Sequence, residues 1–300
     1  MGVSMNQGWI PTPAKELDEV YETLGKRQGT PFFGDINQLK GTGAGKLSLP
    51  CLSAIRQSGQ DLFAKEPQVG PDCTSHAIRN AIDTSRAVDI EIGQPEEWVA
   101  RGATEYIYGM RGSRSGGMNV GRGVKFLNEF GFLVRKEYDG IDLSRYNYAT
   151  GDAWGSRGTP STIKDEAAKF PARYYYNIRT VEEARDGLAN GYGIVCGSNY
   201  GNSGVRNNYG ISPWDSSWNH AMAWGGCDDT GSDLLFLILQ SWGLWNRGGT
   251  AKNFKMPGGS FLIRSRDAER MIREGECWLV GKVQGIPAQN LPDYGSGAFL

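Results

Sequence analysis

The chain has five cysteines but only two histidines, His76 and His220. Any catalysis in which a thiolate attacks a carbonyl carbon while an imidazole carries the proton must therefore use one of these two histidines. Cys73 is the candidate thiol because it begins a predicted helix, whose N-terminal N–H groups and dipole lower the pKa of a thiol. The chemistry that these residue types suggest is acyl transfer to a cysteine.

The two histidines differ in how they could meet Cys73. His76 stands three residues after Cys73 on the same predicted helix, where it is poorly aimed at the sulfur, so we expect it to pack or cap. His220 follows Cys73 by 147 residues, within the roughly 130 to 150 residues that separate the pair in one large class of thiol enzymes. The other four cysteines lie in predicted loops or apolar strands, where a cysteine usually acts as a small hydrophobic residue. They are Cys51, Cys196, Cys227 and Cys277.

Helices must position the thiol, and strands must position the imidazole. Apolar residues recur at helical spacing after Cys73, and we expect Asp72 and Thr74 to cap this helix with their side chains. Further helices are predicted over residues 14–24, 95–110, 119–130, 181–190 and 268–272. Strands are predicted over residues 192–198, 219–227, 234–242, 260–264 and 277–283. The first half is thus mainly helical and the second half mainly β.

A predicted hairpin links His220 to Gln240. Its two strands flank a turn-rich segment at residues 228–233. A three-residue loop would pair His220 with Gln240, whose amide could then orient the imidazole, because directly opposite residues of an antiparallel pair share a face. A two-residue loop would instead pair His220 with Ser241 and turn Gln240 away. The register of this hairpin is therefore a direct test.

Four sequence blocks resemble the papain family of cysteine peptidases. The segment QVGPDCTSHA at 68–77 is similar to the family's glutamine, glycine and nucleophile segment. The segment NHA at 219–221, followed by two glycines, is similar to its histidine strand, and QSWGLWNRGG at 240–249 resembles its Asn-Ser-Trp-Gly block. The segment SGG at 115–117 is similar to the glycine pair that lines the substrate cleft. The blocks follow the family's order and lie between about residue 50 and residue 283.

The resemblance implies an α+β fold with a helical N-terminal lobe, a β-rich C-terminal lobe and the active cleft between them. It also implies thiol-dependent hydrolysis of a peptide or protein substrate, without a cofactor or metal. Cys73 would be the nucleophile, His220 the base and acid, and Gln240 the group that orients the imidazole. The resemblance further implies that Gln68 binds the oxyanion. The residues implied to bind the substrate are Gly116, Gly117, Asn219 and Trp242.

The sequence departs from the family pattern at three places. Gln240 stands where the family has asparagine, Gln68 lies five residues before Cys73 and thus one fewer than usual, and Thr74 replaces an aromatic residue. Catalytic groups misplaced by about 1 Å can lose roughly two orders of magnitude in rate. A second hypothesis therefore stays open, in which a catalytically weak or inactive papain-like scaffold serves as a structural or adaptor subunit of a virus particle, such as a phage.

Composition changes along the chain predict its organisation. Residues 1–60 are rich in Gly, Pro, Lys and Gln and are predicted to form an extended N-terminal arm, which in the assembly hypothesis would contact other subunits. A papain-like domain is predicted over 61–285, with its helical lobe at about 61–170 and its β lobe at about 171–285. Residues 286–300 form a predicted C-terminal tail.

The overall composition argues against several other classes of protein. The net charge is -1, which gives no general attraction to nucleic acid or to an anionic membrane. No apolar run approaches the roughly 18 to 20 residues of a membrane helix. The N-terminus lacks the pattern of a secretion signal and the cysteine count is odd, so we expect a reducing compartment, either the cytoplasm or a virion.

Motifs for nucleotides and metals are incomplete. The glycine-rich stretch at 41–48 lacks the first glycine and the final hydroxyl residue of a phosphate-binding loop. Acidic residues at 228–233 fit a hairpin turn better than a cation site, and no Cys/His cluster with zinc spacing occurs.

Overall fold

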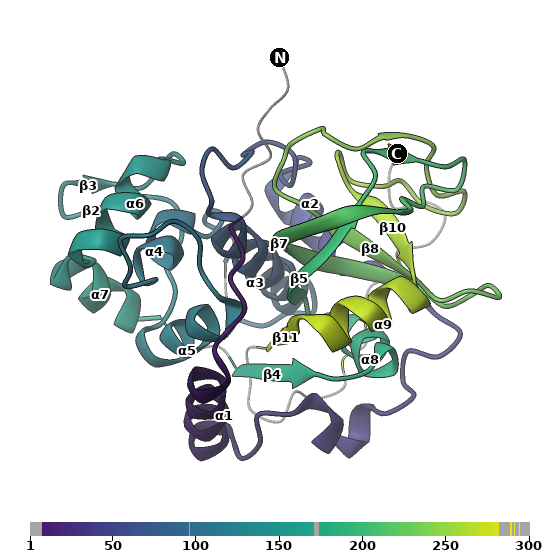
Figure 1. The fold of residues 1–300 in the computed structure, drawn as a ribbon, viewed down its shortest axis with the longest axis horizontal. Coiled ribbons are helices and arrows are strands. Elements are labelled where there is room, and N and C mark those ends of the chain that lie inside the picture. Colours follow the sequence, from purple (N-terminus) through teal and green to yellow (C-terminus); the bar gives the residue numbers. More distant parts are fainter. Residues whose placement is uncertain are drawn as a thin grey trace.

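The computed structural model of the protein describes residues 8–95, 97–170, 174–281, 289, 291 and 294. A long helix, α3 (Cys73–Glu91), lies between a helical half and a β-sheet, and Figure 1 shows it near the middle of the molecule. Most of its residues are buried, because α3 packs against helices on one side and strands β5 and β7 on the other. The first residue of this central helix is Cys73.

The helical half surrounds α3 with short helices. They are α1 (Ala14–Gln28), α2 (Cys51–Ser58), α4 (Thr104–Gly109), α5 (Val120–Phe130), α6 (Tyr148–Arg157) and α7 (Ser161–Ala168), with 3-10 turns η1 (Phe33–Asp35) and η2 (Asn37–Leu39) and a small ribbon of β2 (Glu137–Tyr138) and β3 (Ile141–Asp142). The helices predicted at 14–24, from residue 73 and at 119–130 are confirmed. The helix predicted at 95–110 is wrong in its first half, since Gly102 forms an isolated bridge with Val134 before α4 begins.

The second half forms a seven-stranded sheet. Six strands lie side by side in the order β10 (Phe261–Arg264), β8 (Leu235–Leu239), β7 (Trp214–Asp228), β5 (Ile194–Asn202), β11 (Glu276–Gly281) and β4 (Tyr174–Ile178). The seventh strand, β1 (Leu47–Ser48), pairs with β7. Helices α8 (Val181–Ala189) and α9 (Ser265–Glu274) pack against it, while β6 (Val205–Arg206) pairs with β9 (Arg247–Gly248). The predicted α+β class is confirmed, with helices and sheet arranged in two halves around α3.

A buried charge network fastens the loop before Cys73 to α3. Glu66 forms ion pairs with Arg79 of α3, with Arg101 at 3.3 Å and with Arg135 at 2.8 Å. Burial alone would raise the pKa of Glu66, but the three guanidinium groups lower it to about 2. Glu66 therefore stays ionised at neutral pH and fixes the chain two residues before Gln68.

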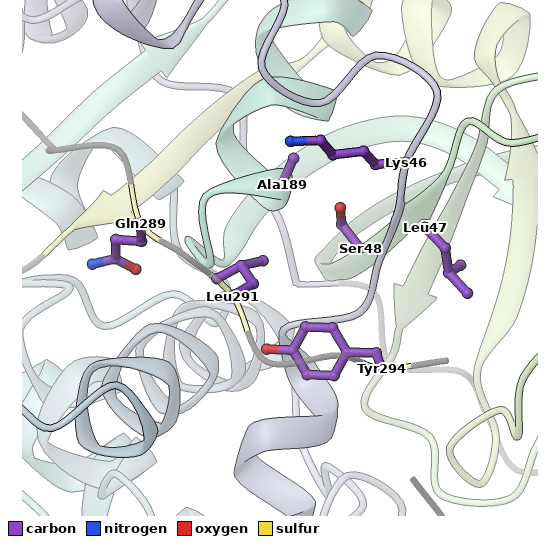
Figure 2. Close-up of a pocket in the computed structure, with 7 residues that line it drawn as sticks. All are labelled: Lys46, Leu47, Ser48, Ala189, Gln289, Leu291 and Tyr294. Atoms are coloured by element: carbon purple, nitrogen blue, oxygen red, sulfur yellow. The ribbon is translucent and has the colours of Figure 1, made fainter. Parts of the chain in front are cut away.

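The described residues of the predicted arm and tail pack against the rest of the chain. Val20 and Leu24 of α1 are buried in the core, and β1 joins the main sheet. Tyr294 near the C-terminus is buried, and its hydroxyl lies 2.8 Å from Ser53 Oγ. Figure 2 shows Tyr294 at a cavity of about 360 Å³, which none of the predicted site residues lines. The division into arm, domain and tail stays a prediction.

None of the helices in the described part is long and apolar enough to cross a membrane.

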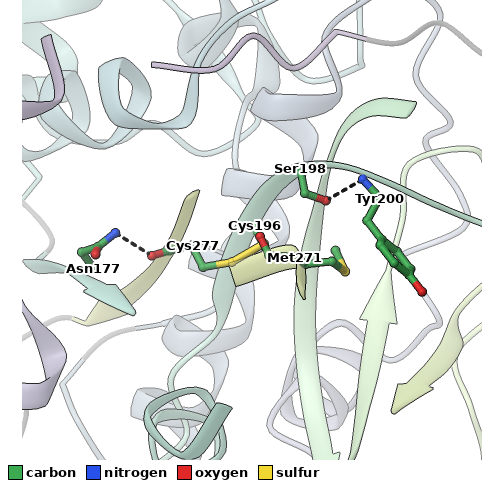
Figure 3. Close-up of a disulfide and its surroundings, with 6 residues drawn as sticks. All are labelled: Asn177, Cys196, Ser198, Tyr200, Met271 and Cys277. Atoms are coloured by element: carbon green, nitrogen blue, oxygen red, sulfur yellow. Dashed lines mark hydrogen bonds between the residues drawn. A yellow bond between two sulfur atoms is a disulfide. The ribbon is translucent and has the colours of Figure 1, made fainter. Parts of the chain in front are cut away.

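A disulfide joins Cys196 of β5 to Cys277 of β11 (Figure 3). The two residues are directly opposite in the antiparallel ladder, with Cα atoms 4.1 Å apart. The prediction that both cysteines act as small hydrophobic residues is therefore wrong, because nothing in one sequence shows which strands are neighbours. Disulfides are typical of oxidising compartments, so the cysteines no longer support the expected reducing one. Of the described cysteines, Cys51, Cys73 and Cys227 are free and buried.

Removing this disulfide should destabilise the protein. The bond closes a loop of 81 residues, and such cross-links typically contribute about 2 to 4 kcal/mol by restricting the unfolded chain. We expect the double variant Cys196→Ala/Cys277→Ala to lose about that much free energy of unfolding in urea titrations. Reductant should destabilise the wild type but leave the double variant unchanged. Equal stability of the two proteins in the absence of reductant would contradict the prediction.

Candidate active site

Cys73 occupies the first turn of α3, as predicted, but the turn is capped differently. The backbone carbonyl of Asp72 accepts hydrogen bonds from the N–H groups of Ser75 and His76 at 3.0 and 3.3 Å. The side chain of Asp72 accepts a hydrogen bond from the Tyr146 hydroxyl at 2.7 Å, and Thr74 donates to the carbonyl of Met118. The prediction that Asp72 and Thr74 cap the helix with their side chains is therefore wrong, because both side chains serve tertiary contacts.

The structure places the Cys73 sulfur against the backbone of β7. The backbone N–H of Ala221, the residue after His220, donates to Cys73 Sγ at 3.4 Å. His76 is separately engaged, since its Nδ1 lies 3.2 Å from an Arg79 guanidinium nitrogen and its Nε2 lies 3.4 Å from the Asp72 carboxylate. His76 is thus held in a buried polar contact on α3, in keeping with the packing role expected for it.

Trp242 covers the imidazole of His220. The two rings stack with centroids 4.2 Å apart and an interplanar angle of 22°. The indole of Trp242 is held in turn by edge contacts with Trp218 and Trp245, at 5.1 and 5.2 Å between centroids. His220 is fully buried, and neither ring nitrogen has a hydrogen-bond partner among the described residues. A flat aromatic face, not a hydrogen bond, therefore holds the imidazole.

Gln240 does not orient His220 in this structure. Strands β7 and β8 pair Asp228 with Leu235 and Ala223 with Leu239, so the hairpin loop is longer than either predicted loop and both predicted registers are wrong. A register shift near Gly226 also displaces the strands. The Gln240 amide instead donates to the carbonyls of Gly243 and Gly259, and its oxygen accepts from the Trp242 N–H. Gln240 thus shapes the loop that carries Trp242.

Gln68 is tied to the same loop. Its backbone N–H donates to the carbonyl of Ser241 at 2.7 Å, and its side-chain oxygen accepts from the Ser241 hydroxyl. The side-chain nitrogen, which would bind an oxyanion, donates to the carbonyl of Gly70 at 2.8 Å. The structure therefore brings Gln68 close to the Ser241–Trp242 segment, with its amide engaged by the protein's own backbone.

Residues 8–12, which we call the strap, occupy the edge where a substrate was expected. The carbonyl of Asn219 accepts from the N–H groups of Gly8 and Trp9 at 3.1 and 3.2 Å. The Met118 N–H donates to the Gly8 carbonyl at 2.8 Å, and the Ile10 N–H donates to the Met118 carbonyl at 3.2 Å. Figure 1 shows this first described part of the chain, in dark purple, running past α3 to α1.

Of the predicted glycine pair, Gly117 lies under the strap. A Cβ atom at Gly117 would approach the Gly8 carbonyl oxygen to 2.8 Å, and Gly117 has a φ of 88°. A Cβ atom at Gly116 would instead meet Pro71 at 2.6 Å. Because real side chains do not tolerate such distances, the missing side chain at Gly117 lets the strap approach. The cleft edge predicted for a peptide, including Asn219, thus pairs with the protein's own backbone.

Two side-chain contacts hold the strap and α1 in place. Thr12 donates to Oε1 of Glu276 at 2.8 Å, and Gly121 of α5 donates its N–H to the same oxygen at 2.9 Å. In α1, Glu16 binds Arg122 through two contacts of 2.7 and 3.1 Å. Trp9, Thr12 and Glu276 were not predicted as site residues from the sequence. The only sequence signal in this region is an aromatic residue, Trp9, within a polar N-terminal segment.

Burial keeps both candidate catalytic groups neutral. Burial raises the pKa of Cys73 to about 11, although N–H groups of Ala221 and Gly8 oppose the rise. Burial lowers the pKa of His220 to about 3, with a smaller contribution from His76. The expected lowering of the Cys73 pKa by the helix is therefore overcome by desolvation. At neutral pH the pair is a thiol and an uncharged imidazole.

The glycine-rich stretch binds carboxylates of the same chain. The N–H groups of Gly41 and Gly43 donate to Asp186 at 2.6 and 3.0 Å, and that of Gly45 donates to Asp229 at 2.9 Å. The amides that could have held a phosphate are therefore used internally. Within the described residues no group of three or more His, Cys, Asp or Glu side chains could hold a metal ion.

Solved structures similar to this chain include a cysteine protease and a procathepsin. Xylellain, a cysteine protease from Xylella fastidiosa, matches 94% of this chain and 100% of its own, with a TM-score of 0.55 and 17% sequence identity. Procathepsin B S9 from Trypanosoma congolense matches 76% of this chain and 75% of its own, with a TM-score of 0.45 and 10% identity. No family model and no curated protein sequence matches the chain. The likeness to xylellain confirms the papain-like fold.

The strap should protect Cys73 from alkylation. At pH 7 we expect iodoacetamide to modify Cys73 slowly in the intact protein, and faster as the pH rises toward the thiol pKa of about 11, because only the thiolate reacts. Trp9→Ala should loosen the strap and increase the rate at pH 7 by at least about tenfold, as water reaches the sulfur. Peptide mass spectrometry locates the adduct.

The matched control for this experiment is Trp214→Ala, which removes an indole that is 50% exposed. That variant should react like the wild type. Equal rates for Trp9→Ala and the wild type would show that the strap does not shield the sulfur.

Proposed function

We propose that the protein is a cysteine peptidase of the papain-like type, with Cys73 and His220 as its reactive pair, held latent by residues 8–12. The observation that carries this proposal is the occupied cleft. The carbonyl of Asn219 and both backbone groups of Met118 already pair with an extended peptide, which lies beside the sulfur of the first residue of α3. A surface that binds one extended segment through its backbone also suits another.

Displacement of the strap supplies the conditions for catalysis. Water would then reach both groups, which favours the charged forms that burial now suppresses. The N-terminal N–H groups of α3 stabilise the Cys73 thiolate, and His220 takes up the proton as an imidazolium stacked on Trp242. The neutral pair of the closed state becomes an ion pair, which is the nucleophilic form.

The proposed reaction runs in two stages. The Cys73 thiolate attacks the peptide carbonyl carbon, and the tetrahedral oxyanion is held by the Cys73 backbone N–H and by the Gln68 amide after it leaves the carbonyl of Gly70. His220 gives its proton to the amine as the C–N bond breaks, which leaves a thioester. His220 then takes a proton from water, which hydrolyses the thioester to an acid and restores the thiol.

Trp242 takes part of the role expected of Gln240. The indole face limits rotation of the imidazole, while Gln240 fixes the backbone of the loop from which the indole projects. Gln240 is accordingly a residue that positions Trp242, and Trp242 positions His220.

A peptide carrying a thiol-reactive electrophile tests the proposal. In the Trp9→Ala background we expect a single adduct at Cys73 and hydrolysis of fluorogenic peptides. Adding Cys73→Ser should abolish both, and adding His220→Ala should lower kcat/KM by at least about a hundredfold, the usual contribution of a general acid and base. The control is Cys51→Ala in the same background, which should retain turnover because Cys51 lies outside the cleft.

The second candidate is a papain-like scaffold without turnover. The lack of a hydrogen-bond partner on either nitrogen of His220 favours it. If the protein is such a scaffold, the electrophilic peptide should form no preferential adduct at Cys73 in Trp9→Ala. Alternatively, the adduct should form equally fast when His220→Ala is added. Either result would rule out the peptidase.

A further inference from the structure

The turn from Gln68 to Cys73 carries the two proposed oxyanion donors at its ends. Gln68 contributes its side-chain amide and Cys73 its backbone N–H, and residues 69–72 separate them. One end is fixed because the Gln68 N–H donates to the Ser241 carbonyl at 2.7 Å. The other end is fixed because Cys73 is the first residue of α3. The distance between the two donors therefore depends on the path of the turn between them.

The hydroxyl group of Tyr146 joins the two ends of this turn. It accepts a hydrogen bond from the Val69 N–H at 3.1 Å and donates one to Oδ2 of Asp72 at 2.7 Å. Val69 is the residue after Gln68, and Asp72 is the residue before the thiol. One oxygen atom therefore connects the neighbours of both proposed oxyanion donors.

The Asp72 carboxylate is buried where it needs a donor. It is 2% exposed, and its Oδ1 atom has no hydrogen-bond partner among the described residues. The Nε2 atom of His76 lies 3.4 Å from Oδ2, farther away than the Tyr146 oxygen. Burial and then the charge of Asp72 raise the pKa of Tyr146, so the hydroxyl keeps the proton that it donates. Because a buried carboxylate that loses its donor is costly, this contact stabilises the turn.

The ring of Tyr146 is itself held by neighbouring side chains. It packs edge to face on His76 with ring centroids 4.9 Å apart. The Arg135 guanidinium, which belongs to the buried charge network, lies 5.8 Å from the centroid of the Tyr146 ring. Tyr148 lies against the middle of the turn, where a Cβ atom at Gly70 would meet its ring at 2.1 Å. The turn is thus held from outside by residues just before and at the start of α6.

We infer that Tyr146 is a positioning residue of the proposed peptidase, and that its hydroxyl sets the spacing of the two oxyanion donors. The inference rests on the proposed function. Gln68 lies one residue closer to Cys73 than in the family pattern, so the turn needs a path of its own. The bridge through Tyr146 fixes that path, and it does not involve the Gln68 side chain, whose amide now donates to Gly70.

This bridge acts on the transition state more than on substrate binding. Hydrogen bonds from the two donors strengthen only as the negative charge on the oxygen develops. A change of about 1 Å in their spacing can cost roughly two orders of magnitude in rate. Loss of the bridge should therefore lower kcat and leave KM nearly unchanged.

A peptide aldehyde and iodoacetamide together test this inference in the Trp9→Ala protein. The Cys73 thiol adds across the aldehyde C=O bond, so that the sulfur binds the carbon and the oxygen lies where the oxyanion forms. Iodoacetamide instead loses iodide to the sulfur and forms no oxyanion. We expect Tyr146→Phe to weaken aldehyde binding and to lower kcat for a fluorogenic peptide, each by at least about tenfold. KM and the limiting alkylation rate at high pH should stay within about twofold.

Variants at Asp72 break or keep the same bridge from its other end. Asp72→Ala should weaken aldehyde binding by a similar factor, and the double variant with Tyr146→Phe should lose little more than either single variant. Asp72→Asn should retain the affinity, because an amide oxygen still accepts from the hydroxyl. The matched control is Tyr138→Phe, which removes a buried hydroxyl that donates to the Val134 carbonyl at 2.7 Å. This control should change neither aldehyde binding nor kcat.

Undiminished aldehyde affinity in Tyr146→Phe, or an equal fall in aldehyde affinity and in alkylation rate, would overturn the inference and leave the peptidase proposal standing. Absence of any hydrolysis and of any Cys73 adduct in Trp9→Ala would instead remove the peptidase proposal, and the inference with it. If Tyr146→Phe does not fold, the aldehyde affinity of Asp72→Ala decides in its place.

Discussion

The backbone pairing of residues 8–10 with Asn219 and Met118 determines the state of the whole site. It places peptide bonds over the first residue of α3 and closes the sulfur from water. Burial raises the pKa of Cys73 beneath this segment, and burial lowers the pKa of His220, whose ring is covered by Trp242. The chemistry of the pair is therefore set by a segment that contributes no catalytic side chain.

The strap fits because neighbouring elements lack side chains where it passes. Gly117 and Gly197 leave space for the Gly8 carbonyl and the Trp9 ring, and Glu276 supplies an acceptor where Thr12 arrives. The disulfide between Cys196 and Cys277 lies next to Gly197 and Glu276 and links the two strands that carry these residues. One cross-link thus joins the two strands against which the strap packs.

The sequence predicted α3, most of the strands and the α+β class, because apolar periodicity and helix ends are local properties. The block around Cys73 also predicted the residue that begins this helix, while the pairing of Cys73 with His220 stays a prediction. The hairpin register was not predictable, since a shift near Gly226 and a longer loop decide it. The role of Trp9 and the disulfide depend on contacts between residues far apart in the chain, which a single sequence does not show.

Hydrogen–deuterium exchange of the intact protein tests the central claim, which is that residues 8–10 are bound in the cleft. The Ile10 and Met118 amides both donate in this pairing. The account predicts slow exchange for peptides that cover residues 8–12 and 116–119 in the wild type, and faster exchange of both together in Trp9→Ala. Rapid exchange of residues 8–12 in the wild type, with residues 116–119 unaffected by the substitution, would contradict it.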